Sequence, residues 1–83
     1  MVRPMEIEFT QSARKHRIGR QHTLEVIANY LPIEIKANGK TKLKWVGKDN
    51  RGLELEVIGV LEKEKLLVIH VMPSQFRGSN KSG

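Results

Sequence analysis

Residues 40–72 read KTKLKWVGKDNRGLELEVIGVLEKEKLLVIHVM, and this stretch decides the fold class. Apolar and charged residues alternate in its first two segments, as expected of strands with one buried face. The third segment is almost continuously apolar, which is typical of a central strand covered on both faces. Short polar turns separate the segments, so we expect an antiparallel meander with strands over residues 41–47, 53–61 and 66–72.

The residues before this meander supply the remaining elements. Residues 5–9 (MEIEF) alternate in the same way and predict one more strand. Thr10 suits the N-cap of a short helix over residues 12–17. A short strand over residues 33–36 is followed by Asn38-Gly39, which is a strong signal for a type I′ hairpin turn.

A second helix is predicted over residues 20–31. It would end before Pro32, because the residue that precedes a proline avoids the helical region. Apolar residues at i, i+3, i+4 and i+7 give this helix one stripe for the core, and they are Leu24, Ile27, Ala28 and Leu31.

The expected fold is therefore a two-layer α+β domain. Two N-terminal helices would pack on a sheet of three to four antiparallel strands. We expect residues 1–77 to form this single compact domain. Residues 78–83 (GSNKSG) are rich in glycine and serine and predict a flexible C-terminal tail.

Composition restricts the functional classes. The chain has 83 residues, no cysteine and a formal net charge of +6. Without cysteine it cannot form a disulfide or a thiolate metal site. The positive charge favours a polyanionic partner: RNA, DNA or an acidic protein. We find neither a signal peptide nor a stretch long enough to span a bilayer, so we expect a cytoplasmic protein with no membrane contact.

Two groups of basic residues are candidates for phosphate binding. Residues 9–20 (FTQSARKHRIGR) contain no acidic residue, and none occurs between Glu8 and Glu25. These charges therefore lack partners on a neighbouring helical turn, which favours a phosphate-facing surface over a merely solvated helix face. The second group, at positions 40, 42 and 44, has strand spacing, and lysines that protect an edge strand from aggregation explain it equally well.

Histidines are the candidates for proton transfer, because histidine changes its charge near neutral pH. His16 belongs to the first basic group, and His22 is interpreted as a surface residue. His70 interrupts the apolar run LLVIHVM, where we expect it to share a strand face with Leu66, Val68 and Met72. A histidine in such a strand is usually a hydrogen-bonded core residue, although near a strand end it could point into a cleft. No zinc-like spacing, glycine-rich phosphate loop or Ser/His/Asp set is found.

The chain resembles a known family in residues 6–77. The strings that carry the resemblance are FTxSARKHRIGR, HTLEVIANYLP, WVGKDNRGLELEVI and LLVIHVMP. They are similar to the RelE/ParE-type toxins of bacterial type II toxin–antitoxin systems, and to the BrnT-like branch in particular. This resemblance implies a small ribonuclease or a ribosome- or gyrase-directed toxin. The first of these would be a metal-independent endoribonuclease that cleaves mRNA, including mRNA on the ribosome, and so inhibits translation. The resemblance also implies a cognate antitoxin as partner and no cofactor.

Site residues follow from the resemblance position by position. Arg14, Lys15 and Arg17 match the basic helix of the family, and His70 and Arg77 match the polar end of its last strand. The catalytic residues implied are His16, His70 and Arg77. The nucleic-acid-binding residues expected are Arg14, Lys15, Arg17, Arg20, Lys42 and Lys44.

Two other interpretations fit the same residues. The chain could be a non-catalytic regulator that binds nucleic acid or an acidic protein, since the charge distribution supports binding without cleavage. Alternatively, the basic charge could serve solubility alone, with the function residing in a protein partner.

Overall fold

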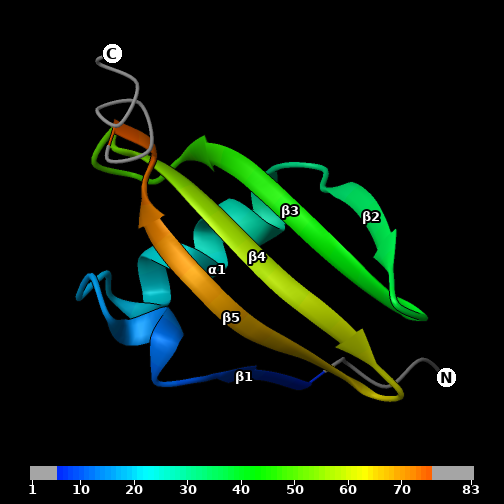
Figure 1. Ribbon diagram of the computed structural model, residues 1–83. Helices are drawn as coiled ribbons and strands as arrows, with labels where there is room; N and C mark the ends of the chain where they lie inside the picture. Colours follow the sequence, from blue (N-terminus) through cyan, green and yellow to red (C-terminus); the bar gives the residue numbers. More distant parts are fainter. Residues whose placement is uncertain (1–5, 76–83) are drawn as a thin grey trace, which may run out of the picture.

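The computed structural model describes residues 6–75, which form one α-helix and a five-stranded sheet (Figure 1). The short strand β1 comes first and is followed by a single 3-10 turn, η1, and by the helix α1. Four more strands then succeed one another along the chain. The elements are β1 (Glu6–Phe9), η1 (Ser12–Arg14), α1 (Arg20–Asn29), β2 (Ile33–Ala37), β3 (Lys40–Lys48), β4 (Glu54–Glu62) and β5 (Lys65–Pro73).

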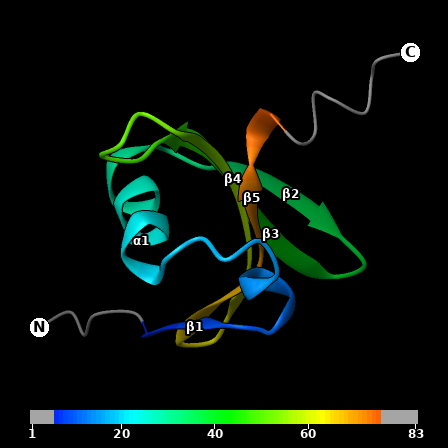
Figure 2. The same ribbon diagram turned by 90° about the vertical axis from the view of Figure 1, so that its left-hand side faces the viewer.

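The strands lie in the order β1-β5-β4-β3-β2. Strands β2 to β5 form an antiparallel meander, whereas β1 lies parallel to β5 at the opposite edge. Helix α1 carries the chain from the β1 edge across one face of the sheet to the β2 edge. Figure 2 shows α1 on one side of the strands, and no other described helix covers the opposite side.

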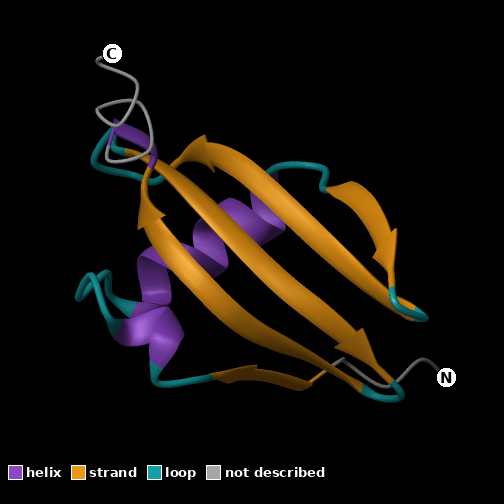
Figure 3. Ribbon diagram, in the orientation of Figure 1, coloured by secondary structure: helices purple, strands orange, loops and turns teal. Residues whose placement is uncertain are grey.

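The predicted α+β class and meander are confirmed, but the prediction of two helices is wrong. The predicted sheet of three to four antiparallel strands is also wrong, because the sheet has five strands and β1 is parallel to β5. Residues 12–14 form only the 3-10 turn, which Figure 3 shows as a short helical piece before α1. The Thr10 hydroxyl accepts a hydrogen bond from the backbone N–H of Ala13 at 3.2 Å, as a cap would. The helix does not continue, because Arg17 adopts a φ of 57°, in the left-handed region that breaks a right-handed helix.

The predicted core stripe of α1 is wrong for Ala28 and Leu31, whereas Ile27 does pack against the core. Thr23 and Val26 are the buried residues of the helix, whereas Ala28 is exposed and Leu31 is 92% exposed. The Thr23 hydroxyl is satisfied because it donates to the carbonyl oxygen of Gly19 at 3.3 Å, so a polar residue can occupy the core face. The helix ends at Asn29, and Leu31 lies beyond it.

A β-bulge in β5 changes which face of the sheet the side chains of this strand point to. Ile58 pairs with His70 and the next residue of β4, Gly59, pairs with Val68, so Ile69 is the extra residue. An extra residue reverses the alternation of side chains along a strand. Leu66, Val68 and Val71 are therefore all buried against the helix layer.

The bulge places His70 on the opposite face, so the expected grouping of His70 with Leu66 and Val68 is wrong. The prediction that this strand is covered on both faces is also wrong. Buried and partly exposed residues alternate along β5, so only one of its faces is covered. Elsewhere the turn prediction is confirmed: Asn38 and Gly39 both have positive φ, 54° and 76°, as a type I′ turn requires.

The core lies between α1 and the sheet. Trp45 is buried in it, and Tyr30 is 38% exposed with its ring over Gly47, where a Cβ would collide with it. The buried residues of the hydrophobic core are Ala13, Val26, Trp45, Leu55, Val57, Leu66, Val68 and Val71. Within residues 6–75, no helix is long and apolar enough to cross a membrane.

Candidate functional site

The sheet face opposite α1, here called the open face, carries a charged cluster of three side chains. Lys44 Nζ lies 2.9 Å from Glu56 Oε2, and His70 Nε2 lies 3.5 Å from Glu56 Oε1. The Glu56 side chain is only 6% exposed, whereas those of Lys44 and His70 are 25% and 33% exposed. The carboxylate is therefore an anchor, and the two nitrogen-bearing side chains are the groups that solvent or a ligand can reach.

Strand register explains why these three side chains meet. Lys44, Ile58 and His70 are directly opposite one another on β3, β4 and β5, so they share one face. Glu56 lies two residues before Ile58 on the same strand and hence on the same face. From there it reaches diagonally to both neighbouring strands, and it lies between the Lys44 and His70 side chains.

The surroundings of this cluster are apolar. Side chains of the open face include Val46, Ile58, Val60, Leu67 and Met72, by register with the three polar residues. Most are partly exposed, and Val60 is 8% exposed. Low-polarity neighbours strengthen electrostatic interactions, so an anion held by the Lys44 ammonium would be bound more firmly than on a fully hydrated surface. Lys42 lies on the same face one row further along β3.

The structure separates the basic segment, residues 14–20, from this cluster. The preceding residue, Ala13, is buried in the core on the helix side of the sheet, and Arg20 is the first residue of α1. Arg20 also places its guanidinium carbon 5.2 Å from the centre of the Phe9 ring. Of the predicted site residues, the structure thus groups Lys42, Lys44 and His70, and it places His16 with the basic segment. Arg77 lies outside the described residues.

A second polar cluster joins α1 to the loop between β3 and β4. Asp49 is buried, and it accepts hydrogen bonds from the backbone N–H groups of Arg51 and Leu53 at 2.8 and 3.1 Å. The Arg51 guanidinium adds two more, at 2.7 and 3.0 Å. Burial alone would raise the pKa of the Asp49 carboxyl, but these hydrogen bonds and the Arg51 charge lower the pKa below its ordinary value.

Helix α1 faces this loop with His22 and Glu25. His22 Nδ1 lies 3.6 Å from Asp49 Oδ2 and 3.9 Å from Glu25 Oε1, and Glu25 accepts a hydrogen bond from the N–H of Asn50 at 3.0 Å. The His22 side chain is 27% exposed, so its interpretation as a plain surface residue is wrong. The cluster holds the loop against the start of the helix.

Sequence reasoning missed Glu56 and Asp49 for different reasons. Glu56 looks like the polar half of an alternating strand, and only the register shows that it lies between Lys44 and His70. Asp49 opens the polar turn DNRG, where an aspartate commonly accepts hydrogen bonds from the next backbone N–H groups. That turn signal was present in the sequence and could have identified Asp49.

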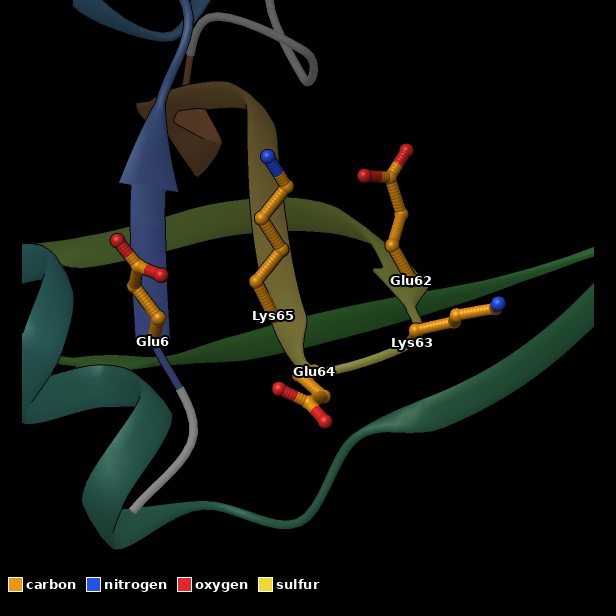
Figure 4. A pocket seen from close by; sticks show the side chains of 5 residues that line it. All are labelled: Glu6, Glu62, Lys63, Glu64 and Lys65. Carbon is orange, nitrogen blue, oxygen red and sulfur yellow. The ribbon is translucent and has the colours of Figure 1, made fainter. Parts of the chain in front are cut away.

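A pocket at the turn between β4 and β5 offers less chemistry. It is lined by Glu6, Glu62, Lys63, Glu64 and Lys65, and Figure 4 shows Lys65 rising between the strands that carry Glu6 and Glu62. Lys65 Nζ donates to Glu8 Oε1 at 3.1 Å, and this bond raises the pKa of Lys65. With three carboxylates among its lining residues, the pocket repels an anionic ligand. Among residues 6–75, no three His, Asp or Glu side chains are arranged to hold a metal ion.

The chain matches no protein-family model, no curated protein and no solved structure. The candidate site therefore rests on the geometry of the open face.

Proposed function

We propose that this protein is a metal-independent endoribonuclease that cleaves mRNA on its open face and acts as the toxin of a bacterial toxin–antitoxin pair. One observation supports the proposal most strongly: a buried carboxylate, Glu56, orients a lysine and a histidine that remain accessible on an uncovered sheet face. A cation together with a group that can take up a proton is what cleavage of RNA by its own 2′-hydroxyl requires.

Each residue has a distinct role in the proposed reaction. Neutral His70 accepts the 2′-hydroxyl proton as the 2′-oxygen bonds to phosphorus. The Lys44 ammonium neutralises the charge that gathers on the non-bridging oxygens. The bond from phosphorus to the 5′-oxygen then breaks, and this oxygen takes a proton from Lys44. The proton held by His70 afterwards passes through water to Lys44, which restores both groups. Glu56 is a positioning residue, since its buried carboxylate faces the two acting groups and not the substrate.

The experiment is cleavage of a defined mRNA fragment in EDTA, with and without ribosomes, under single-turnover conditions. His70→Gln should slow cleavage about 100-fold or more, because it removes the proton acceptor. Lys44→Gln should slow it roughly 10- to 100-fold, and the double variant should be little slower than His70→Gln, since the two groups act together. Lys63→Gln, in the exposed turn after β4, is the matched charge control and should cleave at the wild-type rate.

Two results would count against catalysis on the open face. One is intact RNA with the wild-type protein under every condition. The other is full cleavage by His70→Gln that has a wild-type circular dichroism spectrum.

A second candidate function, a non-catalytic RNA-binding regulator, is favoured by the basic segment. The exposed residues of this segment include Arg14, Lys15 and Arg17, which lie away from the open face. No acidic residue is close to them in the sequence. We expect Arg14→Gln and Arg17→Gly each to reduce the slope of log affinity against log salt by about 0.7, the value for one phosphate contact with a single strand. Arg17→Gly should fold at least as well as wild type, because glycine tolerates the φ of 57°.

Filter binding of single-stranded RNA across a salt series measures these slopes. RNA binding by wild type with no strand cleavage supports the regulator. Unchanged slopes in both variants would show that the basic segment does not face phosphate.

A further inference from the structure

Strand β2 is an uncovered edge with exposed apolar side chains. All five of its residues are exposed, and Ile33 and Ile35 are 62% and 41% exposed. Natural edge strands usually carry inward-pointing charges, prolines or a covering segment, because an open edge can pair with another chain. Among the described elements, β2 pairs only with β3, so its other side is available.

Backbone geometry identifies the groups that face outward from β2. The turn at Asn38 and Gly39 has two residues, so the flanking pair, Ala37 and Lys40, is a hydrogen-bonded pair. Such pairs alternate with non-bonded pairs along an antiparallel ladder. Ile33, Ile35 and Ala37 therefore direct their N–H and C=O groups toward β3. By the same alternation, Glu34 and Lys36 direct theirs toward the free edge.

Only outward-facing residues can form hydrogen-bonded pairs with an added strand, and this limits the registers of a symmetric antiparallel pairing. If Glu34 is opposite Glu34 of a second copy, two carboxylates meet and Pro32 stands opposite Lys36 without an N–H to donate. If Lys36 is opposite Lys36, two ammonium groups meet. In the third register, Glu34 is opposite Lys36 of the partner, and the two-fold axis passes through Ile35.

That third register is complementary in every respect. It forms two Glu34–Lys36 ion pairs between the copies, and neither residue forms an ion pair within the described part of its own chain. Opposite charges directly across from each other stabilise paired strands, and like charges destabilise them. On the open face, Ile35 meets Ile35 of the partner and Ile33 meets Ala37, so the exposed apolar side chains are covered.

The other edge of the sheet lacks this complementarity. In β1, a two-fold pairing centred on Ile7 would place Glu6 opposite Glu8 of the partner, and like charges would oppose it. Glu8 is also engaged with Lys65 on the neighbouring strand, at 3.1 Å. The chain thus has one edge that repels a second copy and one edge whose charges match it.

We propose that the protein forms a two-fold homodimer by antiparallel pairing of β2 with β2, in the register that places Glu34 opposite Lys36 of its partner. The two sheets then join into one continuous sheet. The Lys44 and His70 side chains stay accessible, because they lie on the open face and the contact is made along the edge. This dimer stands independently of any RNA cleavage.

Charge reversal tests the register. Sedimentation equilibrium should show a concentration-dependent monomer–dimer equilibrium for the wild type. Glu34→Lys and Lys36→Glu should each weaken dimerisation roughly tenfold or more, because each places like charges opposite each other. An equimolar mixture of the two variants should form heterodimers with about wild-type affinity, and the double variant E34K/K36E should recover homodimers.

A second measurement identifies the edge itself. The amide protons of Glu34 and Lys36 should exchange quickly at low protein concentration and become protected at high concentration, whereas that of Ile35 is protected throughout by its bond to β3. The matched control is Glu54→Lys, an exposed glutamate on β4, which should leave dimerisation unchanged. A monomer at all accessible concentrations overturns the proposal. So does a dimer that the reversals leave intact, since it would use another surface.

Discussion

Replacing Asp49 with alanine should lower the free energy of unfolding at pH 7 by about 3 kcal/mol, the largest stability loss that we expect from a polar residue of this protein. The variant leaves the N–H groups of Arg51 and Leu53 without their acceptor and removes the partner of the Arg51 guanidinium. Asp49→Asn should lose about half as much, because the amide oxygen can still accept from the two backbone N–H groups. Urea denaturation measures both values.

The pH dependence of this loss has a definite sign. Contacts with Arg51 and Leu53 lower the pKa of Asp49 in the folded state. A lowered folded-state pKa gives stability that is complete above the unfolded value of about 3.9 and is lost as the pH falls through the folded value. The difference in unfolding free energy between wild type and Asp49→Asn should therefore be present at pH 5 and shrink below pH 4.

Charged groups next to Asp49 can also affect the difference in unfolding free energy between pH 5 and pH 3, so the experiment must control for them. The Arg51 guanidinium and the His22 ring both lie against the Asp49 carboxylate. Glu25 contacts His22 and accepts a hydrogen bond from the N–H of Asn50 in the same cluster, so Glu25→Gln serves as the control background. A difference between wild type and Asp49→Asn that persists unchanged to pH 3 in this background would contradict a depressed Asp49 pKa.

Replacing Glu56 with valine should lower the rate of RNA cleavage while the free energy of unfolding changes little. We expect RNA cleavage to fall about 100-fold, because His70 and Lys44 lose the carboxylate that orients them. Stability should change by less than about 1 kcal/mol, or increase. An apolar residue avoids the cost of burying a carboxylate, and Lys44 and His70 remain partly exposed to water.

The readouts for Glu56 are the single-turnover rate, its pH profile and the urea midpoint. A positioning role predicts a lower rate at saturating RNA and a displaced pH profile, with little change in RNA affinity. Glu54→Val is the matched control, since Glu54 is exposed on the same strand and the same face, two residues away. A large loss of stability with unchanged cleavage would mean that Glu56 serves the fold alone.

Local patterns in the sequence were sufficient for most of the strands. The alternation of residues 41–47 and 53–61 predicted β3 and β4, and Asn38-Gly39 predicted the turn before β3, because strand pleating and turn dihedrals depend on neighbouring residues. The α+β class followed from these elements. The same patterns placed Lys42 and Lys44 on one strand face.

Local patterns were weaker guides where long-range packing decides the structure. Residues 12–17 have helical composition, yet the chain turns away at Arg17 so that α1 can begin at Arg20 and cross the sheet. The stripe of Leu24, Ile27, Ala28 and Leu31 has helical spacing, but spacing does not say which stripe faces the sheet. Thr23 and Val26 face it, in part because Gly19 satisfies the Thr23 hydroxyl.

What the sequence determined by itself was the charge, the strands and the tight turn. Each of these depends on residue types and on contacts a few positions apart. Only the tertiary structure decided the site, because the side chains of Lys44, Glu56 and His70 come from three strands. The bulge at Ile69 reverses the alternation along β5, and it alone turns His70 from the core to the open face. A single extra residue in a ladder leaves no mark in the apolar pattern LLVIHVM, since its effect is visible only against the partner strand.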